Sequence, residues 1–276
     1  MNLAVSHTQI TKYSGAYSSD EADLLATEEP LEIRLVHGDT ENRTESSIAV
    51  TMRSPGHDEE LACGFLKTEG IIASWSDVVS VKYCEQVKED ERGNVIKVAL
   101  RPGRQVNMKA LNRHFYTTSS CGVCGKSSLD AVMQQFEPLT DQLTINSRLI
   151  YRLPNALQHY QAVFNHTGGL HATGLFDQHG ELTLVREDIG RHNAMDKVIG
   201  HALMHDVVMS DKLMLVSGRV GFELVQKAVS ARVPVLIAVG APSSLAVSLA
   251  READLVLIGF LRNQRFNIYS GENRVK

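Results

Sequence analysis

The sequence predicts an α/β protein in which a three-layer sandwich over residues 111–276 follows a smaller α+β domain over residues 21–110. The main support is three short, nearly continuous apolar runs at residues 213–216, 235–239 and 255–258. Runs of this kind are typical of strands that helices bury on both faces. Helical patterns separate the runs, so each strand is expected to be followed by a helix.

The N-terminal part begins with residues 1–20, which are rich in Ser, Thr and Tyr and show no clear hydrophobic period. We expect a mobile arm there. Hydrophobic periodicity then predicts the small α+β domain, with the turn Arg92-Gly93-Asn94 before its last strand. Its expected elements are strands at residues 31–37, 47–52, 78–83 and 95–100 and a helix at residues 58–69.

The second part of the chain alternates between strands and helices. No low-complexity linker separates it from the first, and we place the boundary near residue 110. The predicted strands lie near residues 169–176, 182–186, 212–217, 234–239 and 255–260. The predicted helices lie near residues 193–204, 222–231 and 243–253, after an amphipathic helical stretch at residues 127–136.

Composition and charge exclude several classes of protein. The chain has 276 residues, of which 43% are hydrophobic and 22% are charged, as in ordinary globular proteins. A net charge of −4 gives no electrostatic basis for bulk nucleic-acid binding. No apolar run reaches the roughly 18 residues that span a bilayer, and no signal-peptide pattern opens the chain. We therefore expect a cytoplasmic protein with neither nucleic acid nor membrane among its partners.

Four cysteines are too few for a disulfide scaffold in a chain of this length. Cys63 lies in a helical pattern with Leu61 and Phe65, which makes it a neighbour of the core. Cys84 follows a predicted strand and has no His or Cys partner at metal-ligand spacing. We expect both cysteines to be structural.

The other two cysteines form a close pair in the segment Cys121-Gly122-Val123-Cys124-Gly125, directly before the helical stretch at residues 127–136. Both sulfurs are expected near a helix N-terminus, where unpaired N–H groups and the helix dipole lower a thiol pKa from its usual value of about 8.5. The two glycines leave room for a bulky partner, such as the persulfide of a donor enzyme. The loop therefore favours a reactive thiolate.

A CxxC pair alone also suits a redox dithiol or half of a zinc site. A four-cysteine zinc site would need Cys63 and Cys84, which do not form a second CxxC. A thioredoxin-like pair would follow the first strand of a compact domain, whereas this pair lies far into the chain. A zinc deaminase would need H-x-E followed by P-C-x-x-C. Residues 57–59 are His-Asp-Glu, but Ser120 replaces the proline, so we interpret residues 57–59 as a loop and an acidic helix start.

A longer series of segments is far more specific than the CxxC pair. It comprises Gly64-Phe65-Leu66 with Glu69-Gly70-Ile71-Ile72, Ser119-Ser120-Cys121-Gly122-Val123-Cys124-Gly125, Thr167-Gly168-Gly169-Leu170-His171-Ala172, Arg186-Glu187-Asp188-Ile189-Gly190-Arg191-His192-Asn193-Ala194 with Asp196-Lys197, Ser217-Gly218-Arg219 with Phe222-Glu223 and Gln226-Lys227, Ala241-Pro242-Ser243-Ser244-Leu245-Ala246-Val247, and Gly259-Phe260-Leu261-Arg262 with Arg265-Phe266-Asn267. On these segments the chain resembles the FdhD family, the sulfurtransferases required for formate dehydrogenase activity.

The resemblance implies a cytidine-deaminase-like fold for the second part, with no zinc site and no tightly bound metal. It implies that Cys121, with Cys124 also implicated, takes sulfur from a cysteine desulfurase as a persulfide. The sulfur would pass to bis-molybdopterin guanine dinucleotide, the molybdenum cofactor of formate dehydrogenase, which is thus a bound substrate. A homodimer is compatible with the sequence but not specified by it. The family's cofactor-binding segment corresponds to Phe260, Leu261, Arg262, Asn263, Gln264 and Arg265.

Several residues outside the cysteine loop are further candidates. Arg262 and Arg265 follow a predicted buried strand, where α/β sheets bind ligands, and arginine forks suit pyrophosphate oxygens. Asp188 and His192 either share one helical face and orient each other, or Asp188 only caps the helix. His171 lies in a Gly-rich turn and is a weaker candidate. A cofactor-binding chaperone with non-catalytic cysteines remains the alternative function, and a zinc-dependent deaminase is the lesser alternative.

Overall fold

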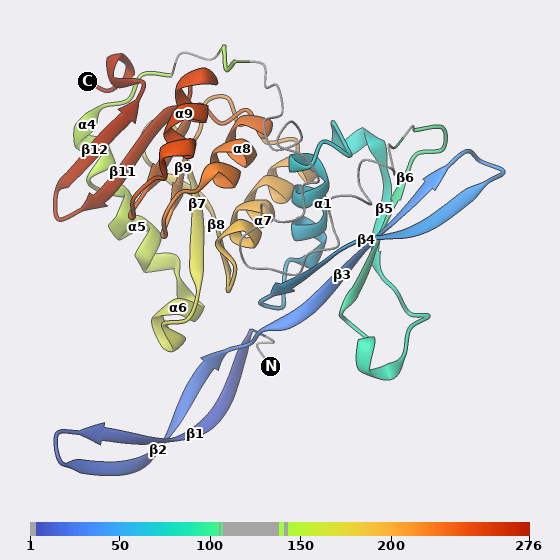
Figure 1. Cartoon of the computed structure of the whole chain (residues 1–276), viewed down its shortest axis with the longest axis horizontal. Helices are drawn as coiled ribbons and strands as arrows, with labels where there is room; N and C mark the ends of the chain where they lie inside the picture. The colour runs from blue at the N-terminus through green and yellow to red at the C-terminus, as the bar shows by residue number, and fades with distance from the viewer. Residues whose placement is uncertain (1–3, 105, 107–137, 141–142) are drawn as a thin grey trace.

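The computed structural model describes residues 4–104, 106, 138–140 and 143–276 and has a mixed α/β fold (Figure 1). Within these residues the strands form sheets of six, four and two strands. No helix in this part of the chain is long and apolar enough to cross a membrane. The α/β class predicted from the sequence is confirmed.

The largest sheet has the strand order β12-β11-β10-β9-β7-β8. Strands β9, β10 and β11 are parallel to one another, and they are the three apolar runs of the sequence. The other strands run antiparallel to their neighbours. The bounds are β7 (His171–Phe176), β8 (Leu182–Asp188), β9 (Leu213–Val216), β10 (Val235–Ala238), β11 (Val256–Arg262) and β12 (Arg265–Ser270).

Helices cover both faces of this sheet, so it is the middle layer of a three-layer sandwich (Figure 1). Side chains alternate between the faces of a strand. Met214 and Val216 therefore share a core with the helices of one face, and Leu213 and Leu215 share a core with those of the other. The first face carries α7 (Arg191–Met204), α8 (Phe222–Ser230) and α9 (Ser244–Glu252), and the second carries α4 (Ser147–Ile150) and α5 (Leu153–Tyr160), which α6 (Ala162–Thr167) follows.

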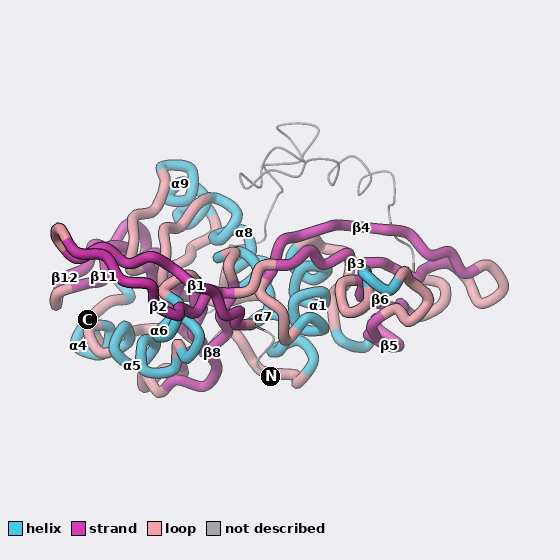
Figure 2. The backbone as a smooth tube through the Cα atoms, turned by 90° about the horizontal axis from the view of Figure 1, so that it is seen from below, coloured by secondary structure: helices cyan, strands magenta, loops and turns pink. Residues whose placement is uncertain are grey.

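The four-stranded sheet has the order β4-β3-β6-β5 and packs against α1. Leu61 and Leu66 of α1 share one core with Leu31 and Ile96 of the sheet. In Figure 2, α1 lies between this sheet and α7, so α1 connects the two halves of the protein. The bounds are β3 (Glu29–Gly38), β4 (Arg43–Arg53), β5 (Val78–Tyr83), β6 (Val95–Leu100) and α1 (Asp58–Thr68), with 3-10 turns η1 (Trp75–Asp77), η2 (Glu89–Glu91) and η4 (Glu272–Arg274).

Helices α1 and α7 cross with their backbones in contact at Gly64 and Gly200. A Cβ atom on Gly64 would overlap the carbonyl of Asp196 in α7, and one on Gly200 would overlap the carbonyl of Glu60 in α1. Only a residue without a side chain fits at either position. At these two glycines the main chains of the two helices are therefore in direct contact, which holds the small sheet against the large one.

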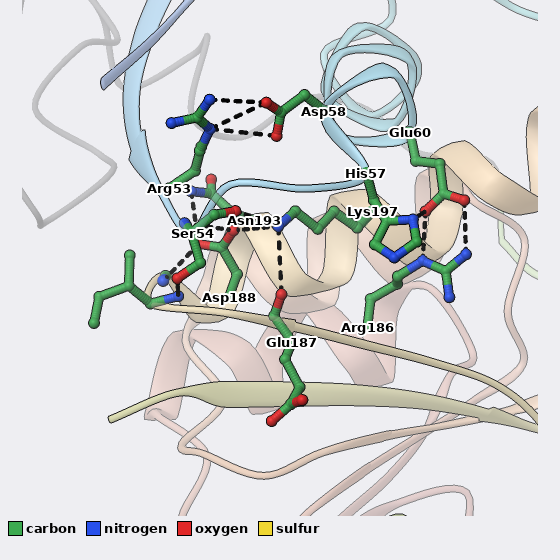
Figure 3. A network of polar contacts seen from close by, with 12 residues as sticks. Arg53, Ser54, His57, Asp58, Glu60, Arg186, Glu187, Asp188, Asn193 and Lys197 are labelled. Carbon is green, nitrogen blue, oxygen red and sulfur yellow. Dashed lines mark hydrogen bonds and ion pairs between the residues drawn. The ribbon is translucent and has the colours of Figure 1, made fainter. Parts of the chain in front are cut away.

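Buried charged side chains connect the two halves beside this crossing (Figure 3). Lys197 Nζ lies 2.7 Å from Asp188 Oδ2 and donates to the carbonyl oxygen of Ser54 at 2.9 Å. Asp188 also accepts from the backbone N–H of Ser54 at 3.2 Å. Further along, Arg186 Nη2 donates to Glu60 at 2.7 Å. The contacts of Ser54 and Glu60 join the segment around α1 to the second half of the chain.

The N-terminal residues form a two-stranded hairpin of β1 (Val5–Ser14) and β2 (Tyr17–Ala26), where the sequence analysis expected an arm without strands. Gly15 opens its two-residue turn with a φ of 63°, as a type II′ turn requires. The hairpin points away from the body (Figure 1), and most of its side chains are exposed. Because polar residues occupy both of its faces, no alternation in the sequence marks these strands.

The other predicted elements agree with the structure to within a few residues, and β5 and β6 agree at both ends. The sequence missed α4, α5, α6 and β12. The helix predicted at residues 127–136 and the boundary predicted near residue 110 lie outside the described residues.

Candidate functional site

One edge of the six-stranded sheet collects the connections into α7, α8 and α9. The carboxyl ends of β8 to β11 lie there, and β7 begins there because it runs antiparallel to β9. Open α/β sheets bind ligands at edges of this kind, where loops and helix N-termini converge. We call the sheet edge the set of residues 171, 188–192, 217–221, 239–243 and 259–262.

Backbone hydrogen bonds tie three loops of the sheet edge together. The N–H of Gly240 donates to the carbonyl of Gly218 at 3.0 Å, and the N–H of Phe260 donates to the carbonyl of Gly240 at 3.0 Å. A Cβ on Gly240 would lie 2.9 Å from the Gly218 oxygen, so the loops approach this closely because residue 240 is glycine. The loops after β9 and β10 and the bulge in β11 are thus joined through their backbones.

His171 and Arg191 lie against the loop that follows β9. A Cβ on Gly218 would lie 3.2 Å from His171 Nδ1 and 3.8 Å from Arg191 Cδ, so both side chains border the bare backbone of Gly218. Ser217 holds this loop in place, since its hydroxyl accepts from the N–H of Ala172 at 2.9 Å. Burial and the charge of Arg191 lower the pKa of His171, which keeps its imidazole neutral at neutral pH.

His192 and Glu223 form a second pair of side chains at this place. His192 Nε2 lies 3.1 Å from Glu223 Oε2, and both side chains are partly buried. The carboxylate favours a protonated imidazole, but burial and the positive charge of Lys227 and Arg191 act against it and lower the pKa of His192 to about 3. His192 is therefore a neutral hydrogen-bonding group.

Helices α7 and α8 both begin at the sheet edge with a glycine as N-cap, and neither has a side-chain cap. The N-caps are Gly190 and Gly221, and a Cβ on Gly221 would meet no heavy atom within 4 Å. In contrast, the Ser243 hydroxyl caps α9 by accepting from the N–H of Ala246. Helix N-termini without a side-chain cap present free N–H groups and favour negative charge.

Asp188 is fully buried and serves neither of the roles considered from the sequence. Besides Lys197 and Ser54, its carboxylate accepts from the N–H of Gly190 at 2.8 Å and from the amide of Asn193 at 3.2 Å. The N-cap of α7 is Gly190, and His192 pairs with Glu223 instead. The role of Asp188 is to hold the start of α7 against the segment before α1.

The segment from Phe260 to Arg265, to which the family resemblance assigns the cofactor, forms the turn between β11 and β12. Asn263 and Gln264 have φ values of 52° and 55°, which makes a type I′ turn between Arg262 and Arg265. All four are exposed, so both arginine side chains are available to a ligand. The two arginines were predicted to follow a buried strand, whereas Arg262 is the last residue of β11 and Arg265 is the first residue of β12.

Phe260 and Leu261 differ from the rest of this segment. Leu261 is 1% exposed and belongs to the core, so its contribution to any ligand would come from its backbone. Phe260 has a φ of 56° at a bulge in β11, a conformation rare for an aromatic residue and common at ligand sites. The guanidinium of Arg262 lies 5.9 Å from the centre of the Phe260 ring.

Two of the four cysteines lie in the described part of the chain, and both are buried as predicted. Cys63 is fully buried in α1, and burial beside Glu59 and Glu60 raises the pKa of its thiol to about 12. Cys84 is 8% exposed. Cys121 and Cys124 lie outside the described residues.

Residues 57–59 form the loop and helix start expected from the sequence. His57 is the N-cap of α1, and Asp58 is buried in an ion pair with Arg53 at 2.8 Å. The carboxylate of Asp58 is therefore engaged in an ion pair inside the small domain. In the residue ranges that the structure describes, no three His, Cys, Asp or Glu side chains are grouped to hold a metal ion.

The sequence analysis did not single out Arg191, Gly218 or Glu223 as site residues, although each lies in a segment that matches the family. The available signal was positional, because Gly190-Arg191 and Ser217-Gly218 each follow a predicted strand and precede a predicted helix. These residues can be placed at one edge only when the strand order is known, and the sequence alone does not give that order.

A family model described as the FdhD/NarQ family matches residues 26–276 of the chain. A protein of Streptomyces coelicolor is 48% identical over 93% of this chain and 90% of its own length. Proteins of Mycobacterium tuberculosis and Saccharolobus solfataricus are 46% and 39% identical, each over 100% of both chains. All three are named sulfur carrier protein FdhD.

A solved structure from Desulfotalea psychrophila, provisionally described as a formate dehydrogenase accessory protein, has a similar fold. The TM-score is 0.74, and the match covers 99% of this chain and 100% of the other. Sequence identity is 22%, so this likeness supports the fold alone.

Proposed function

The chain belongs to the FdhD/NarQ family, and on this premise we propose that it is a cytoplasmic sulfurtransferase. It accepts sulfur from a cysteine desulfurase as a persulfide on Cys121. It then passes the sulfur to bis-molybdopterin guanine dinucleotide, the molybdenum cofactor that a formate dehydrogenase needs. Cys124 assists the transfer.

The observation that carries this proposal is the similarity to full-length relatives named sulfur carrier protein FdhD, at 39% to 48% identity. Matches that extend over the whole of both chains support a common activity rather than one shared domain. The description of the Desulfotalea protein as a formate dehydrogenase accessory protein favours the same client enzyme.

The burial of the other cysteines supports the choice of Cys121 and Cys124. The chain has four cysteines, and a sulfur carrier must meet the persulfide of another protein. Cys63 is inaccessible, and its raised pKa keeps it a thiol, whereas the thiolate is the nucleophile. Cys84 is nearly as buried. The CxxC pair is therefore the candidate that remains.

The chemistry of loading is a thiolate–persulfide exchange. The thiolate of Cys121 attacks the terminal sulfur of the donor persulfide, the S–S bond of the donor breaks, and the donor cysteine leaves as a thiolate. No net oxidation occurs. Release of the sulfur as sulfide needs two electrons, and attack of the Cys124 thiolate on the Cys121 sulfur supplies them as the pair closes to a disulfide.

The sheet edge and the turn after β11 suit the nucleotide parts of the cofactor substrate. Arg262 and Arg265 offer exposed planar forks that match phosphate oxygens in a bidentate manner. The aromatic ring of Phe260 beside Arg262 provides an apolar surface next to these charges. If the cofactor binds at this edge, the same protein molecule holds both the sulfur to be transferred and the cofactor that accepts it.

Mass spectrometry of the intact protein tests the proposal. After incubation with a cysteine desulfurase and cysteine, the wild type should gain the mass of one sulfur atom, and cyanide should remove it as thiocyanate. Cys121→Ala should gain none, whereas Cys63→Ala, the matched control, should load normally if it folds. Loading of Cys121→Ala at the wild-type level would contradict the assignment.

A protein that binds the cofactor but never acquires cyanide-releasable sulfur would instead be a chaperone with non-catalytic cysteines. In that case, formate dehydrogenase activity in cells carrying Cys121→Ala should equal that of the wild type. The two functions thus predict opposite results for the same variant.

A further inference from the structure

We propose that the sheet edge contains a subsite for a phosphate or diphosphate group, formed by Arg191, His171 and the backbone around Gly218. The subsite is separate from Arg262 and Arg265, the charges that the family resemblance associates with the cofactor. Its link to the cofactor rests on the proposed function, since that substrate carries diphosphate groups. The subsite itself follows from the contacts below.

Arg191 supplies the positive charge. Its Nε atom is buried and has no hydrogen-bond partner among the described residues. Buried polar groups in native proteins almost always have partners, so this buried guanidinium N–H points to an acceptor other than the described residues. An anionic oxygen is the acceptor that a guanidinium binds most strongly.

The buried aspartates of this region already have lysine partners, so Arg191 is not needed to neutralise them. Arg191 forms no ion pair with any residue that the structure describes. Its charge therefore remains available for a ligand. The occupied pairs are Asp188 with Lys197 and Asp196 with Lys227.

His171 and Gly218 give the subsite its shape. The imidazole of His171 and the side chain of Arg191 border the same glycine, at 3.2 Å and 3.8 Å from the position that a Cβ would occupy. A neutral imidazole has one N–H to donate and adds no charge. The absence of a side chain on Gly218 leaves its backbone open between the two groups, as in many loops that bind phosphate.

The helices α7 and α8 add to this environment. Both begin at the sheet edge with glycine N-caps and without a side-chain cap, and Arg191 is the first residue of α7. The N–H groups of the first turns and the positive ends of two helix dipoles therefore act with Arg191 rather than alone. A tetrahedral, multiply charged oxyanion suits this combination better than a single carboxylate.

Calorimetric titration of the full chain tests the proposal with three probes, namely inorganic pyrophosphate, GDP and guanosine. Wild type should bind pyrophosphate and GDP, and guanosine much more weakly. Arg191→Ala should weaken binding of both phosphate probes by about tenfold to a hundredfold, the usual loss for one charge-assisted contact. Arg92→Ala removes an exposed arginine of the small domain and should leave both affinities unchanged.

Two further variants keep the test decisive if Arg191→Ala does not fold. Arg191→Lys retains the charge but not the fork and should bind with intermediate affinity. Gly218→Ala leaves every charge in place and narrows the subsite, so it should also weaken pyrophosphate binding. Wild-type affinity in all these variants, or no binding of pyrophosphate to the wild type, would overturn the proposal.

Sulfur loading of the same samples separates this inference from the proposed function. Arg191→Ala should take up sulfur like the wild type, since thiolate–persulfide exchange requires no bound phosphate group. If no sample loads, the sulfur-carrier function fails while the anion subsite stands. If all samples load but pyrophosphate binding does not depend on Arg191, the subsite fails while the function stands.

Discussion

The ammonium group of Lys197 lies 2.7 Å from the carboxylate of Asp188, and both side chains are buried where α7 meets the segment before α1. Lys197→Met should therefore lower the free energy of unfolding by about 3–5 kcal/mol, because it leaves a buried carboxylate without its cation. Chemical denaturation measures this change. Lys12→Met, which removes an exposed partner of Glu21 on the hairpin, should change the free energy of unfolding far less, because water screens this pair. Equal losses of unfolding free energy in the two variants would show that the buried pair stabilises the fold no more than the exposed pair does.

Gly64→Ala should destabilise the protein by about 3 kcal/mol or more, because the added methyl group overlaps the main chain of α7 rather than a side chain that can move. The matched control is Gly221→Ala, whose Cβ would enter open space, and its cost should stay below about 1 kcal/mol. Thermal and chemical unfolding of both variants checks this. A Gly64→Ala protein as stable as the wild type would mean that α1 and α7 can separate at no cost.

His192 should stay neutral throughout the physiological pH range, because its pKa in the folded protein is about 3. In the unfolded chain an imidazole titrates near pH 6.5, so the unfolded state binds more protons between these values. The contribution of His192 to stability is therefore present above about pH 6.5 and declines as the pH falls toward 3. NMR should show no titration of its ring between about pH 8 and pH 5. A midpoint within that range would contradict the effect of burial.

The variant with both Arg262→Ala and Arg265→Ala should bind GDP about tenfold to a hundredfold more weakly than the wild type, since each arginine offers a charge-assisted contact. Persulfide loading should survive, because the turn contributes no core residue at these two positions. Calorimetry and intact mass of the same preparation give the two readings. Unchanged GDP affinity, or lost loading, would remove this turn from the cofactor assignment.

The central strands of the large sheet could be predicted because their burial on both faces restricts them to apolar residues. Residues 235–238 are buried on both faces, so every position is apolar. The hairpin β1–β2 has the opposite environment, with both faces in water, and its residues vary without a constraint that a pattern could reveal. Strand β12 was not predicted because the turn before it has Asn263 and Gln264 at positive φ, where glycine would usually indicate a hairpin turn.

The site was predictable only in part for a different reason. The two arginines flank the turn at the end of β11, so the local sequence around this predicted strand was enough to place them. The approach of His171 to Gly218 depends on β7 running antiparallel to β9, and the two residues are far apart in the sequence. Asp188 likewise faces Ser54 from a distant segment. Contacts between such distant residues depend on the strand order and on the helix crossing. Neither can be predicted from hydrophobic periodicity or motif spacing.

The backbone contact between Gly64 and Gly200 limits how this protein can be divided. A fragment that began after β6 would leave the glycine face of α7 in water, together with Lys197 and with Asp196, whose carboxylate accepts from Thr68 at 3.0 Å. Such a fragment has no replacement for the main chain of α1, so it would not fold by itself. The segment before residue 104 is thus not an accessory module that evolution or engineering can exchange, and the two halves should unfold in a single cooperative transition.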